Sequence, residues 1–222
     1  MSAKNALLAG ATGLVGGYLL RRLLAHPSYV RVEILVRREL PIRDPKITQR
    51  IVEFARLGDG APGVAPDDVF CCLGTTIRKA GSEEAFRRVD YDYPLALGRL
   101  AKAAGAGTFL MVSALGADPK SAVFYNRVKG EVEQAIAAIG LPAAYFFRPS
   151  LLLGPRAENR PREKIGIAVG KAIAPLMIGG LRKYRPIHAD AVARAMVYVA
   201  NRNVPAGVIE SDAIAQLASL ES

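Results

Sequence analysis

The sequence predicts a single α/β domain in which a doubly wound parallel sheet carries helices on both faces and a small C-terminal cap. Short apolar runs alternate along the chain with longer segments of helical periodicity, which is the pattern of consecutive βαβ units. The length of 222 residues suits one large domain better than two independent ones. Hydrophobic residues make up 51% of the chain and aromatic residues only 7%, which is typical of helices packed on a parallel sheet.

The N-terminal part of the chain is expected to hold four strands, with a helix between the first two. The first strand covers residues 5–9, and the helix follows over residues 14–26 and ends before Pro27. Three further apolar runs are expected to be strands, at residues 31–36 (RVEILV), 47–54 (ITQRIVEF) and 69–74 (VFCCLG).

The middle of the chain is expected to continue the alternation of helix and strand. Apolar side chains recur at helical spacing over residues 83–104, with an irregularity expected near Pro94. Further elements are expected at residues 108–113 (strand), 122–139 (helix), 143–149 (strand), 164–174 (helix) and 189–201 (helix). We therefore expect residues 1–222 to form one domain, with residues 151–222 adding a small cap on the substrate side.

A glycine-rich run, Gly10-Ala-Thr-Gly13-Leu-Val-Gly16, joins the first strand to the first helix. Glycine permits a tight turn and lets the backbone approach a pyrophosphate, while the helix N-terminus supplies amides and a favourable dipole. The run therefore predicts a Rossmann-like dinucleotide site. A tight turn without a ligand is the alternative.

Two arginines, Arg37 and Arg38, follow directly after the second expected strand. In a dinucleotide-binding fold this position meets the adenosine ribose, where an acidic residue binds the 2′-hydroxyl of NAD and an arginine binds the 2′-phosphate of NADP. Glu33 is acidic, but it lies three residues too early in the strand to bind the 2′-hydroxyl of NAD. The pattern favours NADP(H) over NAD(H), and solvated surface arginines are the alternative.

A candidate catalytic group combines Ser113, Tyr125 and Lys129. Tyr125 and Lys129 stand four residues apart on an expected helix, so their side chains share one face. Ser113 ends the fifth strand, at the sheet edge where ligands of such folds bind. A buried tyrosine beside a surface lysine is the alternative interpretation.

Five ordered motifs, GATGLVG, CLGTT, VSALGAD, FYNRVKGEVE and RPSLLLGPR, together resemble the short-chain dehydrogenase/reductase superfamily. The chain is most similar to its atypical branch of Tat-interacting oxidoreductase-like proteins, over residues from about 4 to 200. The resemblance implies a Rossmann fold, a nicotinamide cofactor and oxidoreductase chemistry.

The resemblance also implies a role for each motif residue. The pyrophosphate would be held by Gly10, Thr12, Gly13, Leu14 and Val15, and the 2′-phosphate by Arg37 with Arg38 in support. The adenine-side ribose would pass Leu73, Gly74 and Thr75, and the nicotinamide would border Pro149, Ser150 and Leu151. Tyr125 would be the general acid, Lys129 would bind the nicotinamide ribose, and Ser113 would bind the substrate oxygen. Asp90 stands where many relatives carry an asparagine for a proton relay, which leaves that relay open.

The resulting hypothesis is an NADPH-dependent oxidoreductase that reduces a small carbonyl compound. Only 72 residues follow Ser150, which disfavours large nucleotide-sugar substrates. A regulatory or redox-sensing protein that binds NADP(H) without physiological turnover is the alternative, because fold does not determine function. The net charge of +10 is scattered without a basic run, which disfavours nucleic acid as a partner.

The remaining expectations concern the surroundings of the protein. Cys71 and Cys72 are neighbours and would point to opposite faces of a strand, which argues against a disulfide and favours the reducing cytoplasm. The chain has no apolar run of about 18 residues, so we expect no membrane span. We also expect no metal site, and a monomer or a homodimer.

Overall fold

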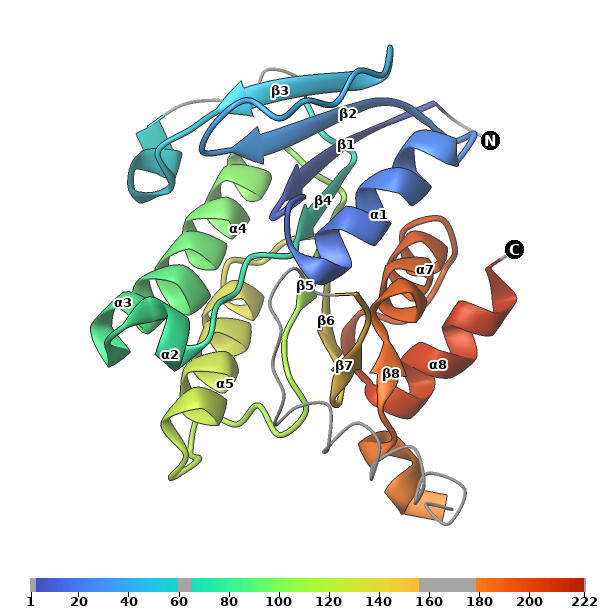
Figure 1. Ribbon diagram of the computed structural model, residues 1–222. Helices are drawn as coiled ribbons and strands as arrows, with labels where there is room; N and C mark the ends of the chain where they lie inside the picture. The colour runs from blue at the N-terminus through green and yellow to red at the C-terminus, as the bar shows by residue number, and fades with distance from the viewer. Residues whose placement is uncertain (1–2, 60–64, 156–178, 222) are drawn as a thin grey trace.

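The computed structural model describes residues 3–59, 65–155 and 179–221. Within them a seven-stranded parallel sheet, in the order β3-β2-β1-β4-β5-β6-β9, runs through the middle of the molecule (Figure 1). Its strands are β1 (Lys4–Ala9), β2 (Tyr29–Val36), β3 (Ile47–Ile51), β4 (Asp68–Cys71), β5 (Thr108–Val112), β6 (Ala143–Arg148) and β9 (Gly207–Glu210). The chain reverses its direction of winding between β1 and β4, so the predicted doubly wound fold is confirmed.

Helices cover both faces of the sheet (Figure 1). One face carries α1 (Leu14–Ala25), α7 (Ala189–Ala200) and α8 (Ser211–Leu220), and the other carries α3 (Glu83–Arg87), α4 (Tyr93–Ala103) and α5 (Phe124–Ala137). The shorter elements are η1 (Phe54–Asp59), α2 (Ile77–Ala80), η2 (Arg88–Asp92), β7 (Leu152–Leu153), η4 (Gly179–Tyr184) and β8 (Ile187–His188). No helix in these ranges is long and apolar enough to span a bilayer.

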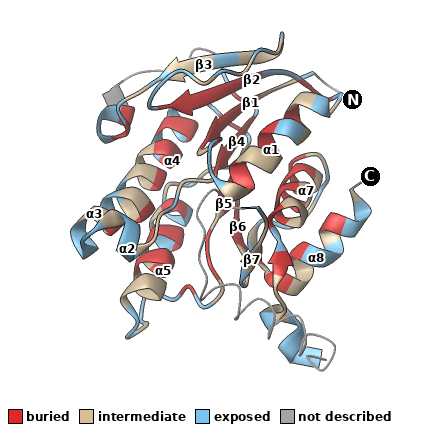
Figure 2. Cartoon of the chain, in the orientation of Figure 1, coloured by how far each residue is buried: buried red, intermediate tan, exposed pale blue. Residues whose placement is uncertain are grey.

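Alternate side chains of the strands build two cores. In β1, Ala6 and Leu8 pack toward α1 and α7, while Leu7 and Ala9 pack toward the side of α4. All four are buried, as expected for a parallel strand that is covered on both faces (Figure 2).

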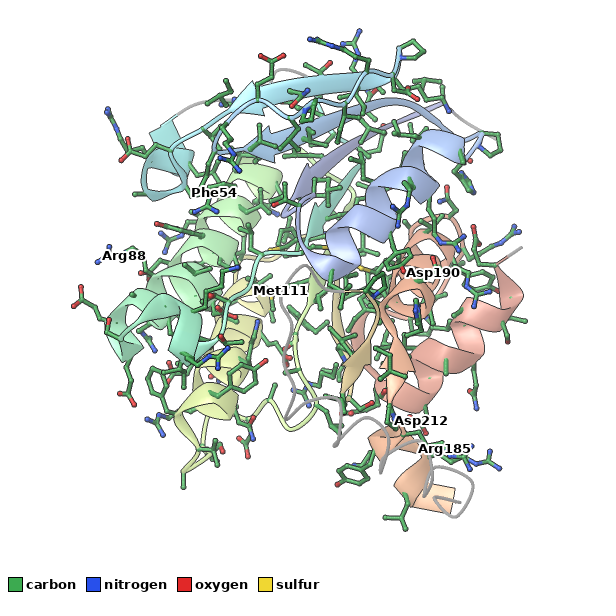
Figure 3. The ribbon with its side chains drawn as sticks, viewed as in Figure 1. Phe54, Arg88, Met111, Arg185, Asp190 and Asp212 are labelled. Carbon is green, nitrogen blue, oxygen red and sulfur yellow. The ribbon has the colours of Figure 1, made fainter. Side chains whose placement is uncertain are left out.

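A partly exposed ion pair joins the first helix to the C-terminal part of the chain. Arg22 of α1 donates from Nε and Nη2 to the two oxygens of Asp190 in α7, each at 2.8 Å. Asp190 lies where α7 begins, beside α1 (Figure 3). Such a bidentate pair fixes geometry as well as charge, so the C-terminal helices are joined to the dinucleotide-type half of the sheet.

The expected helix over residues 83–104 contains a π-helical turn, η2 (Arg88–Asp92). Pro94 has no amide hydrogen with which to bond the carbonyl of Asp90 four residues earlier. The ladder widens at this point, and the Tyr93 amide bonds the carbonyl of Arg88. The irregularity expected near Pro94 is thus confirmed, and its place is the turn that carries Asp90.

The C-terminal region contributes more to the sheet than the sequence predicts. Strand β9 (Gly207–Glu210) pairs with β6 and was not expected, because it is four residues long and follows Pro205 and Ala206. The third strand also ends earlier than expected, at Ile51, and residues from Phe54 form η1. The helix expected over 164–174 lies outside the described residues.

Candidate functional site

The predicted site residues follow the carboxyl ends of neighbouring parallel strands. Gly10 follows β1, Leu73 and its two successors follow β4 after one further residue, Ser113 follows β5 and Pro149 follows β6. Because these strands are parallel and adjacent, their ends meet at one edge of the sheet (Figure 1). The structure therefore brings together the segments that the motifs singled out.

The glycine turn is built by close backbone packing. Gly10 has φ +91°, and a Cβ there would lie 2.4 Å from the carbonyl oxygen of Cys72. A Cβ on Gly16 would lie 2.0 Å from the carbonyl oxygen of Gly10. The Gly13 amide donates to that same oxygen at 2.9 Å. Gly10 and Gly16 are therefore required by the turn itself and by its contact with α1.

Gly13 has a different reason to be glycine. It is the N-cap of α1 and makes no capping side-chain hydrogen bond, and both it and Thr12 are exposed. A Cβ at Gly13 would lie 3.2 Å from the Gly10 oxygen, a tight but less severe contact. The first amides of this 12-residue helix thus have no capping side chain, an arrangement that suits an anion.

The helix α5 presents Tyr125 and Lys129 one turn apart. The Tyr125 ring is half-buried against Phe86, with ring centroids 5.5 Å apart. Lys129 is buried, and Ser113 is buried where its amide bonds the carbonyl of Phe147 at 2.7 Å. The edge of the sheet thereby holds a tyrosine, a lysine and a serine from two adjacent elements.

Asp90 pairs with Lys129 inside this site. Its Oδ1 lies 2.7 Å from Lys129 Nζ, and its Oδ2 accepts the amide of Thr75 at 2.9 Å. Burial on its own lowers the pKa of Lys129, but Asp90, together with Tyr125 and Cys71, outweighs burial, and the net pKa is raised. Lys129 is therefore a charged ammonium with a buried counter-charge, and Asp90 also holds the loop after β4.

A second carboxylate, Glu133, was missed by the sequence reasoning. The Ser113 hydroxyl donates to Glu133 Oε1, and both side chains are buried. Arg148 donates to Glu133 from Nε at 3.0 Å and from Nη2 at 2.5 Å, and it lies 3.4 Å from Glu210. The hydrogen bond to Glu133 is the main reason why the pKa of Arg148 is raised. The signal was present in the motif FYNRVKGEVE, where Tyr125, Lys129 and Glu133 follow at four-residue steps.

The loop after β6 is fixed from the C-terminal side. The Ser150 amide bonds Ser211 Oγ at 3.1 Å, and the Ser150 hydroxyl donates to the carbonyl of Arg185. Arg185 lies between η4 and β8, close to the start of α8 at Asp212 (Figure 3). Leu151 is exposed next to this anchored serine.

Arg37 and Arg38 are exposed at the end of β2, beside the strand that leads into the glycine turn. Their position is the one that the sequence predicted for a 2′-phosphate contact. No cluster of histidine, cysteine and carboxylate groups in the described ranges could hold a metal ion. A hollow of about 450 Å³ beside α1 is lined by Arg22, His26 and Asp190, far along the helix from the glycine turn.

The sequence matches a known protein family over most of its length. The NAD dependent epimerase/dehydratase family matches residues 6–210. The chain belongs to this family. The expected relationship to the short-chain dehydrogenase/reductase superfamily is thereby confirmed.

Relatives within the family cover most of the chain. Protein HTATIP2 of Rattus norvegicus is 40% identical over 167 residues, which are 73% of this chain and 69% of the rat protein. This relative confirms the expected resemblance to the Tat-interacting branch. Protein fmp52, mitochondrial, of Emericella nidulans is 32% identical over 214 residues, which are 91% of each chain.

Solved structures of other proteins share the fold of this chain. The structure of MoeE5 in complex with UDP-glucose and NAD has a TM-score of 0.69 and 17% identity, over 97% of this chain and 81% of that one. Human epimerase family protein SDR39U1 with NADPH has a TM-score of 0.62 and 17% identity, over 92% of this chain and 72% of that one.

The expectation of a cytoplasmic location is wrong. Fungal relatives that cover about nine-tenths of this chain are named mitochondrial proteins. The expectation rested on Cys71 and Cys72, both of which are free and one of which is buried. Free cysteines indicate that no disulfide is needed, but they do not distinguish one reducing compartment from another.

The residues of the family site fit a nicotinamide dinucleotide. The uncapped N-terminus of α1 and the glycine turn leave backbone amides for a pyrophosphate. Gly74 lies beside Lys129, and a Cβ there would make only ordinary contact with Nζ, at 3.9 Å. Lys129 has three N–H groups, of which Asp90 needs one, so it can also bind ribose hydroxyls.

Proposed function

We propose that this chain is an NADP(H)-dependent oxidoreductase that reduces a small carbonyl compound. The observation that carries the proposal is Tyr125 one turn from the buried, charged Lys129, at the sheet edge that also holds the glycine turn. Family membership supports the nicotinamide cofactor, and the solved relatives were obtained with NAD or NADPH.

When bound, the cofactor would supply a hydride to the carbonyl carbon. Tyr125 would donate its hydroxyl proton to the carbonyl oxygen, so that the product is an alcohol and the oxidised cofactor. Lys129 would hold the ribose beside the reacting ring, and Asp90 would hold Lys129. The amides at the start of α1 would bind the pyrophosphate, and Pro149, Ser150 and Leu151 would border the nicotinamide.

Ser113 has a more restricted role than the resemblance implies. Its hydroxyl hydrogen is donated to Glu133, whose pairing with Arg148 requires the charged carboxylate, a group without a hydrogen to give. Ser113 therefore offers lone pairs to a substrate. The Ser113 oxygen would accept a hydrogen bond from a substrate hydroxyl. A substrate carbonyl oxygen would instead accept its hydrogen bond from Tyr125.

The cofactor preference follows from Arg37, with Arg38 in support. Both guanidinium groups are exposed at the end of β2, where a 2′-phosphate would be bound. The two solved relatives were obtained with different cofactors, NAD in one and NADPH in the other. The preference for NADP(H) therefore rests on these arginines.

The deciding experiment is a substrate screen with the purified protein. A panel of aldehydes, ketones and quinones is mixed with NADPH, and NADPH oxidation is followed. We expect turnover of at least one carbonyl class, and binding of NADPH by calorimetry. If the protein binds neither NADPH nor NADH, the proposal is wrong, because it requires a bound nicotinamide cofactor.

A second candidate is a redox-sensing protein that binds NADP(H) without physiological turnover. The hydrogen bond from Ser113 to Glu133 favours it, because it occupies a hydroxyl that a reductase would direct toward a carbonyl. Tight NADPH binding with no turnover across the panel would support this candidate.

The names of the fungal relatives support a mitochondrial location for this protein. Fractionation of the source cells tests this location.

A further inference from the structure

Five ionisable side chains, one of them the candidate catalytic Lys129, form ion pairs at this site, and we call them the charge cluster. Its members are Asp90, Lys129, Glu133, Arg148 and Glu210. The exposed fractions of Asp90, Lys129 and Glu133 are 1%, 5% and 6%. With every member ionised the cluster contains two cations and three carboxylates, and its net charge is negative. This sign is opposite to that of the whole chain, which carries +10.

Within the cluster, Asp90 alone is paired with Lys129. The two atoms lie 2.7 Å apart, whereas Glu133 and Glu210 are both engaged by Arg148. An uncharged side chain at position 90 would leave the Lys129 ammonium without its buried counter-charge. The identity of residue 90 therefore decides the electrostatic potential at Lys129.

We propose that Asp90 tunes the site to favour the oxidised form of the cofactor over the reduced form. This inference rests on the proposed function, in which Lys129 binds the ribose next to the nicotinamide. The oxidised nicotinamide ring carries a positive charge and the reduced ring is neutral. An uncompensated ammonium would repel only the oxidised ring, and in a water-poor site such repulsion is weakly screened. Asp90 removes that repulsion.

The consequence is a change in the reduction potential of the bound cofactor. A site that binds the oxidised form more tightly than the reduced form lowers the potential of the bound couple, so that hydride is given up more readily. It also retains the oxidised product for longer. Asp90 is a positioning residue in this account, because it acts through Lys129.

The test compares cofactor affinities and needs no substrate. Calorimetry gives the Kd values for NADP⁺ and NADPH in the unmodified protein, in Asp90→Asn and in Asp92→Asn. Asparagine can still accept the Thr75 amide, so Asp90→Asn removes the charge and keeps the loop contact. Asp92 lies in the same π-helical turn but is exposed, and Asp92→Asn makes the same chemical change.

We expect the ratio of Kd for NADP⁺ to Kd for NADPH to rise about tenfold in Asp90→Asn, which corresponds to about 30 mV for a two-electron couple. The ratio should stay the same in Asp92→Asn. Circular dichroism checks that each variant is folded. Asp90→Ser is a second uncharged variant, and its hydroxyl oxygen can accept a hydrogen bond from the Thr75 amide. If Asp90→Asn binds both forms of the cofactor with an unchanged ratio of Kd values, the inference about Asp90 is overturned while the proposed function stands. Absence of binding by either form in the unmodified protein would overturn the proposed function as well.

Discussion

The Ser113 hydroxyl donates to Glu133, and Arg148 donates to both oxygens of that carboxylate. The contact joins the end of β5 to the middle of α5, so it links Ser113 to the helix that carries Tyr125 and Lys129. Both Ser113 and Glu133 are buried. The charge partner of the buried Glu133 is Arg148, so losing that pair is expected to cost stability.

Replacing Glu133 by glutamine should destabilise the protein by about 2–4 kcal/mol, because it leaves Arg148 with only the more distant Glu210. Urea unfolding followed by circular dichroism measures the change. The matched control is Glu131→Gln, two residues earlier on α5, which removes a partly exposed pair with Arg87. That control should cost less than about 1 kcal/mol. Equal losses in the two variants would contradict the structural role of Glu133.

Replacing Tyr125 by phenylalanine should lower the rate of carbonyl reduction by about 10²–10⁴-fold, because the proton donor is lost. The ring should keep its packing against Phe86, and the affinity for NADPH should barely change. Steady-state rates and calorimetry on the same preparations separate the two effects. Full activity in Tyr125→Phe would show that another group is the acid.

Replacing Arg37 by aspartate should erase or reverse a preference for NADPH over NADH, which we expect to be at least about tenfold in the unmodified protein. The introduced carboxylate would repel the 2′-phosphate and accept the 2′-hydroxyl of NADH. Arg202→Asp is the control for net charge. Arg202 follows Asn201, which bonds Tyr29 at the start of β2, whereas Arg37 follows the other end of that strand. Equal affinities for the two cofactors before any substitution would remove the basis of this prediction.

Two glycine variants should separate binding from folding. In Gly13→Val the side chain would stand at the uncapped start of α1, so cofactor binding should be lost while the circular dichroism spectrum is largely kept. In Gly16→Ala the new Cβ would meet the Gly10 oxygen at 2.0 Å, so the loss should include stability. Calorimetry and thermal unfolding distinguish the two outcomes. Normal NADPH binding by a folded Gly13→Val protein would show that the turn is only structural.

The parts of the fold that could be predicted are those in which local pattern and tertiary role agree. The run from Lys4 to Ala25 combines a buried strand, a glycine turn and an amphipathic helix, and it folds as expected. Ser113, Tyr125 and Lys129 could be singled out as candidates because each stands at the end of a strand or on one face of a helix. Their convergence at one sheet edge follows from parallel topology.

The parts that could not be predicted depend on contacts between distant residues. Strand β9 is too short to show a period, and its pairing with β6 decides its conformation. Glu133 looks like an ordinary helix surface residue until Arg148 of β6 is placed beside it. The partner of Asp90 could not be chosen either, because the π-helical turn around it changes the direction of its side chain relative to a regular helix.

The hydrogen bond between the Ser150 amide and Ser211 has a consequence for the order in which the protein matures. Translation delivers Ser211 after every strand from β1 to β6, and after the glycine turn and the α5 helix. A nascent chain that has released β6 but not α8 already contains the glycine turn, while its loop after β6 lacks this anchor. The helix α8 is thus made after these strands and the glycine turn, and its first residue completes the anchoring of the loop after β6.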